Sequence, residues 1–223
     1  GLVISSQKPD RSAYPNLQFL PASHPLPDKN SLAASLEVRD FCAEIPEGAS
    51  VLLGITGGTS SMLALPPGDI EIKELAEAYQ LLLDSGMDIH QMNRVRKKLC
   101  ELKGGGLAEA LAHCRLSSVY LSDVPGDDPA SIGSGPTIAD TGSYAEAVAL
   151  CRDFEIWEDL PYSVRNWLES AEEPAPFEHA DHEVRVMSPA KEVAGQIGDK
   201  LKQEGYHTRV ADKAYSGSTL VIA

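Results

Sequence analysis

Short apolar runs alternate along this chain with longer stretches in which apolar side chains recur every three or four residues. The short runs predict strands and the longer stretches predict helices, because one face of a strand repeats every second residue and one face of a helix about every 3.6 residues. The predicted strands are Leu2–Ser5, Val51–Thr56, Ser117–Ser122, Glu183–Met187, His207–Ala211 and Thr219–Ala223. The predicted helices are Ser31–Ala43, Ile72–Asp84, His90–Glu101, Gly105–Cys114, Tyr144–Phe154 and Ala190–Gly205.

This alternation is typical of βα units. It predicts an α/β fold with a doubly wound, mainly parallel sheet and helices on both faces. The acidic, proline-containing stretch Glu169–His182 has no apolar period, so we expect a surface loop there. The chain opens in a predicted strand and closes on the apolar run Leu220–Ala223, so we expect a domain that is incomplete at both ends. The alternative is a complete chain whose terminal strands lie at sheet edges.

Composition narrows the classes of function. A net charge of −14 argues against a nucleic-acid or anionic-membrane partner, because binding to either requires a basic face. No apolar run is long enough to span a membrane and no leader pattern opens the chain, so a cytoplasmic location is the expectation. The cysteines Cys42, Cys100, Cys114 and Cys151 lie far apart, which favours small buried side chains over a metal site or disulfides.

The first candidate for chemistry is the glycine- and hydroxyl-rich turn Thr56–Met62, directly after a predicted buried strand. Ligands of open α/β sheets bind at this position, and glycines allow the backbone to approach an anion closely. Backbone N–H groups and hydroxyls here are expected to donate to phosphate or carboxylate oxygens. The candidate binding residues are Thr56, Gly57, Gly58, Thr59 and Ser60. The alternative is an ordinary turn without a ligand.

The second candidate is a local group of cations in an acidic protein. Helical spacing places Asn93, Arg96 and Lys97 within one turn, and Lys103 follows just before three glycines. Such a group suits the anionic oxygens of a nucleotide or substrate. The alternative is a solvent-exposed helix face.

The third candidate is the loop from Ser122 to Thr137, dense in Asp, Ser, Gly and Pro. Carboxylates at the end of a strand suit Mg²⁺, which takes one or two carboxylates together with phosphate oxygens and water. The expected metal ligands are Asp123, Asp127 and Asp128, and the expected substrate or phosphate contacts are Ser134, Gly135 and Thr137. The alternative is that some of these aspartates only cap backbone groups in turns.

Taken together, these segments resemble the glycerate 2-kinase family, whose C-terminal part is known as the MOFRL domain and some of whose members are named hydroxypyruvate reductases. The resemblance rests on four segments in the same order and spacing. They are HPLPD at 24–28, TGGTSSM at 56–62, IHQMNRVRKKL at 89–99 with KGG at 103–105, and SDVPGDDPASIGSGPT at 122–137.

The resemblance implies ATP- and Mg²⁺-dependent transfer of a phosphoryl group to the 2-hydroxyl of D-glycerate or a similar small hydroxy acid. It implies that residues 1–223 form the N-terminal-type, Rossmann-like domain, without the C-terminal MOFRL domain. In that arrangement Lys103, Asp123 and Arg96 are the expected catalytic residues, and Asn93 joins the binding residues. The sequence does not fix the oligomeric state, for which a homodimer is one expectation.

Two alternatives to a kinase stay open at this point. An NAD(P)H-dependent hydroxypyruvate reductase is disfavoured, because the chain has no GxGxxG followed by a ribose-binding acid. A catalytically degenerate paralogue that keeps the ligand cleft is suggested by Thr56 and Thr59, which stand where the family typically has Ser and Gly.

Overall fold

The strands form two parallel sheets. The computed structural model describes residues 1–7, 14–122, 124, 126–175, 177–187 and 190–210. Strands β1 (Leu2–Ser5) and β2 (Gln18–Pro21) pair in one sheet, whereas β3 (Ser50–Ile55), β4 (Arg115–Leu121) and β5 (His182–Met187) form the other, with β4 in the centre. In the larger sheet Ile55 lies opposite Tyr120, and Tyr120 lies opposite Val186.

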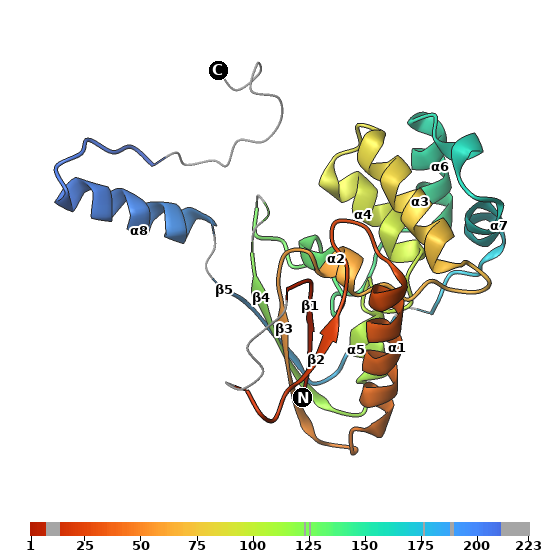
Figure 1. The fold of residues 1–223 in the computed structure, drawn as a ribbon, viewed down its shortest axis with the longest axis horizontal. Helices are drawn as coiled ribbons and strands as arrows, with labels where there is room; N and C mark the ends of the chain where they lie inside the picture. Colours follow the sequence, from red (N-terminus) through yellow and green to blue (C-terminus); the bar gives the residue numbers. More distant parts are fainter. Residues whose placement is uncertain (8–13, 123, 125, 176, 188–189, 211–223) are drawn as a thin grey trace.

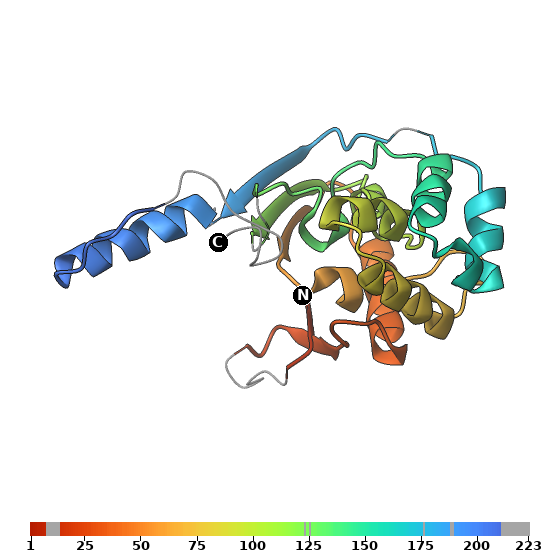
Figure 2. The ribbon, with the colours of Figure 1, turned by 90° about the horizontal axis from the view of Figure 1, so that it is seen from above.

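Most helices gather at one side of these strands (Figure 1). Their bounds are α1 (Lys29–Glu44), α2 (Thr59–Met62), α3 (Ile72–Asp84), α4 (Ile89–Lys98), α5 (Gly106–Ala110), α6 (Tyr144–Asp153), α7 (Tyr162–Ser170) and α8 (Ala190–Gln203), with short 3₁₀ turns at Ile132–Ser134 and Trp157–Asp159. Helices α3, α4, α6 and α7 form a cluster, while α8 extends away from the body in both views (Figures 1 and 2). No helix of the described chain is long and apolar enough to cross a membrane.

Two apolar cores hold the helices in place. The first lies inside the helical cluster and includes the fully buried Leu75, Val95 and Leu99. The second lies between α1, α5 and one face of the larger sheet, where Leu111 packs with Leu116. The cysteines are free and buried, as expected for small apolar side chains in these cores. Together the two cores fix the positions of α3 and α4 relative to the end of β3.

A third, smaller cluster fastens the loop after β4 onto the strand ends. Ile132 is fully buried against Ile55 and Tyr120. The hydroxyls of Tyr120 and Thr137 also lie 2.7 Å apart, within hydrogen-bonding distance. The part of the loop that contains Ile132 and Thr137 therefore covers the carboxyl ends of β3 and β4.

The other face of the larger sheet carries exposed apolar side chains. By register Leu52, Leu121 and Met187 belong to this face, and Leu52 is 73% exposed. The expected α/β class, with parallel strands flanked by helices, is confirmed. Within the described chain, the covered face is the one that meets α1 and α5.

Most predicted elements are found within a few residues of their expected bounds. The helix predicted for Gly105–Cys114 is shorter, because hydrogen bonds between residues three apart replace the α-helical pattern after Ala110. The strand predicted for His207–Ala211 is wrong over its described residues, 207–210: this segment turns back onto α8, where Thr208 Oγ1 donates to the Gly198 carbonyl at 3.1 Å. The strand predicted for Thr219–Ala223 lies outside the described residues.

Other differences concern elements that the pattern did not reveal. The helix predicted for His90–Glu101 ends at Lys98, and the Glu101 N–H instead donates to the Leu65 carbonyl at 2.9 Å. Strand β2 and helix α7 were not predicted; α7 also includes the first residues of the expected loop at Glu169–His182, the rest of which is irregular up to β5 over its described part.

Candidate functional site

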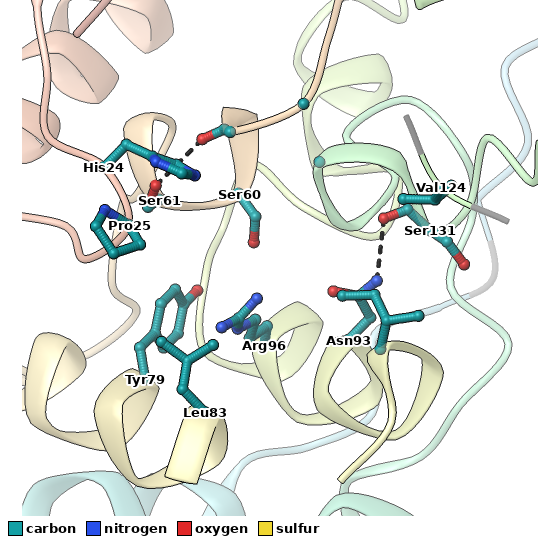
Figure 3. A pocket seen from close by; sticks show the side chains of 14 residues that line it. His24, Pro25, Ser60, Ser61, Tyr79, Leu83, Asn93, Arg96, Val124 and Ser131 are labelled. Carbon is teal, nitrogen blue, oxygen red and sulfur yellow. Dashed lines mark hydrogen bonds between the residues drawn. The ribbon is translucent and has the colours of Figure 1, made fainter. Parts of the chain in front are cut away.

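A pocket of about 200 Å³ lies at the carboxyl end of β3 (Figure 3). Its walls come from the loop before α1, the glycine turn after β3, helices α3 and α4, and the loop after β4. The residues that matter most for its chemistry are His24, Gly58, Ser60, Tyr79, Arg96 and Ser131. The pocket therefore joins all three segments that the sequence singled out.

The glycine turn needs glycine for both conformation and space. Gly58 has φ +80°, and a Cβ there would lie 3.1 Å from His24 Cδ2 and 3.2 Å from Met62 Cε. Any other residue would be strained in this region of φ and crowded by the His24 ring. The N–H groups of Gly57 and Gly58 have no hydrogen-bond acceptor within the described chain, so they remain available to a ligand.

Arg96 places a buried cation at this pocket. Its side chain comes from α4, the residue is only 7% exposed, and Cζ lies 4.9 Å from the centroid of the Tyr79 ring. Its Nε is buried without a hydrogen-bond partner, and no carboxylate of the described chain forms an ion pair with the guanidinium. Burial lowers the pKa of Arg96 because it disfavours the charged form. Such a cation is stabilised when an anion binds beside it.

Asn93 connects α4 to the loop after β4 and to the glycine turn. Its Nδ2 donates to the Ser131 carbonyl at 3.0 Å, and its Oδ1 accepts a hydrogen bond from Ser134 Oγ at 2.8 Å. Ser134 Oγ also lies 2.8 Å from Ser60 Oγ. These bonds fix the position of Ser60 at the pocket through side chains that are themselves buried.

Lys103, an expected catalytic residue, is 4% exposed and does not line the pocket. Its Nζ donates to the Leu63 carbonyl at 2.6 Å and lies 5.7 Å from the Tyr79 ring centroid. Burial lowers the pKa of Lys103, but interactions with Cys100 and Tyr79 outweigh this effect, so the pKa is raised and the ammonium group stays charged. Lys97, which also belonged to the expected cation group, pairs with Asp140 at 3.6 Å.

The expected metal ligands are only partly described. Asp123 lies outside the described residues. The Asp128 carboxylate accepts hydrogen bonds from Ala130 N at 3.0 Å and Ser131 Oγ at 2.9 Å, which is the turn-capping alternative. Asp127 has a φ of +53° in the same turn. The described residues contain no group of three His, Cys, Asp or Glu side chains that could hold a metal ion, and the metal role of these aspartates stays a prediction.

The remaining predicted residues divide between the pocket and its surroundings. Those that line the pocket are Gly57, Gly58, Ser60, Asn93 and Arg96. Those that do not line it are Thr56, Thr59, Ser134, Gly135 and Thr137. Their roles toward a substrate or nucleotide stay predictions.

Pattern reasoning missed several residues that line the pocket. Tyr79, Leu83 and Ile89 belong to apolar helical spacings, which indicate core packing and carry no signal of a pocket. His24 was visible only through the HPLPD segment. Ser131 belongs to the loop already singled out, and its small polar side chain was the available signal.

Residues 1–169 match the model of a protein family described as "Domain of unknown function (DUF4147)". The chain belongs to this family. Its expected resemblance to glycerate 2-kinases is confirmed by the relatives of known name.

Three of those relatives are 30–38% identical to this DUF4147 chain over the residues that align. A Pyrococcus horikoshii protein named glycerate 2-kinase is 35% identical over 153 residues, which is 69% of this chain and 34% of that protein. A glycerate kinase from Rattus norvegicus is 30% identical over 207 residues, covering 92% and 40%. An Agrobacterium vitis protein, whose name assigns hydroxypyruvate reductase activity only provisionally, is 38% identical over 172 residues, covering 77% and 39%.

A solved structure has the same arrangement of elements. The crystal structure of glycerate kinase from Thermotoga maritima superposes with a TM-score of 0.76 at 26% identity, covering 92% of this chain and 49% of that one. The DUF4147 chain thus spans about a third to a half of the length of the relatives it matches.

Proposed function

We propose that the protein containing this chain is an ATP- and Mg²⁺-dependent kinase that phosphorylates the 2-hydroxyl of D-glycerate or a similar small hydroxy acid. The observation that carries the proposal is Arg96, a buried guanidinium that lines a pocket and has no ion-pair partner in the described chain. The names of the relatives from Pyrococcus horikoshii and Rattus norvegicus support the same activity.

The pocket suits the small acid better than the nucleotide. Its volume of about 200 Å³ is below the roughly 300–1,000 Å³ of pockets for drug-sized ligands. In this proposal Arg96 binds the carboxylate of the acid, and the N–H groups of Gly57 and Gly58 add neutral donors to its oxygens. Such contacts hold the acid in one orientation, which is the main contribution that a protein makes to phosphoryl transfer.

Mg²⁺ enters this proposal as the ion that accompanies ATP. Because the described residues contain no cluster of metal ligands, no step is assigned to an ion held by this domain. A reductase is not favoured, since the relatives carry that name only provisionally and the chain lacks a nicotinamide-binding fingerprint.

The test is a coupled ADP-release assay on the whole gene product with D-glycerate and Mg-ATP. We expect turnover in the wild type. In Arg96→Gln we expect the KM for glycerate to rise by about 10- to 100-fold, which corresponds to the loss of a charge-assisted hydrogen bond, while the KM for ATP changes little.

Arg94→Gln is the matched control, because Arg94 lies on the same helix, is 46% exposed and pairs with Glu146 away from the pocket. Its kinetics should remain close to those of the wild type. A folded wild type that releases no ADP with glycerate or with other small 2-hydroxy acids would overturn the proposal. Equal effects of the two substitutions would contradict the role of Arg96.

A further inference from the structure

The hydroxyl groups of the glycine turn donate their hydrogens to the protein itself. Thr56 Oγ1 donates to the Gly57 carbonyl at 3.2 Å, and Thr59 Oγ1 donates to the Thr56 carbonyl at 2.8 Å. Ser61 Oγ donates to the Gly58 carbonyl at 3.2 Å. Each hydroxyl has one hydrogen, so these side chains do not donate to an anion in the way that the sequence suggested.

The hydrogen of Ser60 also has a fixed direction, which follows from a chain of buried hydrogen bonds. Asn93 must turn its Nδ2 toward the Ser131 carbonyl, because a carbonyl only accepts. Its Oδ1 therefore faces Ser134, and Ser134 Oγ must donate to it. Since the single hydrogen of Ser134 is then engaged, Ser60 Oγ donates to Ser134 Oγ across their 2.8 Å contact.

Ser60 consequently faces the pocket with lone pairs and no available hydrogen. Figure 3 shows its side chain pointing into the pocket from the side opposite Arg96 and Tyr79. Those two side chains are donors: within the described chain, the guanidinium has no ion-pair partner and the buried hydroxyl of Tyr79 has no hydrogen-bond partner. Arg96 and Tyr79 therefore donate hydrogen bonds from one wall of the pocket, whereas the Ser60 side chain on the other wall accepts them, beside the N–H donors of Gly57 and Gly58.

We propose that Ser60 accepts a hydrogen bond from the hydroxyl on the carbon next to the substrate carboxylate, and that it thereby selects 2-hydroxy acids over 2-oxo acids. The proposal rests on the function proposed above and specifies its substrate class. A 2-hydroxy acid presents an accepting carboxylate to Arg96 and a donating hydroxyl to Ser60. A 2-oxo acid has only acceptors at these positions, so its ketone oxygen meets the lone pairs of Ser60.

Ser60 cannot easily reverse its direction to suit a ketone. Turning its hydrogen toward the pocket breaks the hydrogen bond to Ser134 Oγ. Because Ser134 is fully buried, no solvent water can donate to its Oγ instead. Ser134→Ala removes this acceptor and releases the hydrogen of Ser60. Both substitutions should therefore reduce the preference for 2-hydroxy acids: Ser60→Ala by weakening the binding of the hydroxy acid, and Ser134→Ala by strengthening the binding of the oxo acid.

The experiment is isothermal titration of the whole gene product, without ATP, with D-glycerate and with hydroxypyruvate. We expect the wild type to bind glycerate about tenfold more tightly than hydroxypyruvate, as one well-made hydrogen bond allows. Ser60→Ala should weaken glycerate binding by about the same factor and leave hydroxypyruvate nearly unchanged. Ser134→Ala should bind hydroxypyruvate more tightly relative to glycerate than the wild type does.

Ser143→Ala is the control for general destabilisation, because Ser143 caps α6 by accepting from Glu146 N at 3.1 Å and does not line the pocket. It should lower the melting temperature without changing the ratio of the two affinities. If the wild type binds glycerate but Ser60→Ala weakens both acids equally, or Ser134→Ala leaves the ratio unchanged, this inference is wrong and the kinase proposal survives. If the wild type binds neither acid, both proposals are wrong.

Discussion

Tyr79 packs the face of its ring against the guanidinium of Arg96, whose Cζ lies 4.9 Å from the ring centroid. Tyr79 is 1% exposed, so its ring separates this cation from solvent on one side. The contact links the apolar core of α3 to the charged side of the pocket. It is thus a packing interaction on which the position of the Arg96 guanidinium depends.

Replacing this ring should reduce the stability of the protein. We expect Tyr79→Leu to lower the free energy of unfolding by about 3 kcal/mol, because a cation–π contact is lost and a cavity is left in a tight core. Tyr79→Phe keeps the ring, so it should change the free energy of unfolding by less than about 1 kcal/mol. Urea unfolding of both variants checks this, and a larger loss in Tyr79→Phe than in Tyr79→Leu would contradict it.

Gly133 should tolerate no Cβ beside Thr59. It has φ +61°, and a Cβ there would lie 2.9 Å from Thr59 Cβ. We expect Gly133→Ala to destabilise the protein by about 2–3 kcal/mol through backbone strain and overpacking. Gly126→Ala is the control: its φ is +90°, but a Cβ there meets no atom of the described residues within 4 Å, so only the backbone strain of about 1 kcal/mol applies.

The clash at Gly133 predicts a rescue. Thr59→Gly removes the opposing side chain, so adding it to Gly133→Ala should recover part of the lost stability. Thermal unfolding of the single and double variants gives the coupling between the two positions. Strictly additive effects would show that Thr59 is not the obstacle.

Lys98 should contribute more to the free energy of unfolding than Glu173, its exposed ion-pair partner. Its Nζ, with the side chain 6% exposed, lies 3.3 Å from Asp140 and donates to the Gly142 carbonyl at 2.6 Å. We expect Lys98→Met to cost about 3 kcal/mol, because the Asp140 charge is left with less compensation in a buried place. Glu173, 47% exposed, pairs with the same Nζ, and Glu173→Gln should cost less than about 1 kcal/mol. Denaturant titration measures the loss of unfolding free energy in each variant. Similar losses in Lys98→Met and Glu173→Gln would contradict the prediction.

His182 should make folding less favourable in mild acid. Burial, assisted by the neighbouring His179, holds the pKa of His182 below its ordinary value of 6.5. The unfolded chain then binds a proton at a pH where the folded protein does not, so stability falls as the pH drops below about 6.5 toward the lowered pKa. His182 Nε2 also lies 2.9 Å from Ser118 Oγ.

His182→Gln isolates this contribution, since its amide can still reach Ser118 but does not titrate. The urea midpoint of the wild type should fall more between about pH 7.5 and 5.5 than that of the variant. If the urea midpoints of the wild type and His182→Gln fall equally, the pH dependence of stability comes from groups other than His182.

The sequence predicted the parts of the site that depend on local periodicity and residue spacing. The strand ending near Ile55, the glycine turn and the cations of α4 follow from period and spacing, and the structure places Arg96 and Gly58 at one pocket. The position of Tyr79 at the pocket could not be predicted, because an aromatic residue at helical spacing indicates core packing. Only tertiary contacts show what its ring packs against.

The missed elements have similar reasons. Strand β2 is four residues long, and its pairing with β1 depends on a partner that local pattern does not reveal. In α7 the buried positions are Val164 and Leu168, a spacing too sparse to stand out among polar neighbours. The hydrogen direction of Ser60 is a property of the folded network and is absent from any single segment.

The bond between Ser60 and Ser134 joins residues 74 positions apart in the chain. The pocket therefore depends on a contact between distant parts of the chain, which folding brings together. Any molecule that binds there recognises only the folded chain, and it raises the melting temperature with its concentration. Thermal shift with candidate acids therefore reports on occupancy of the pocket without any need for turnover.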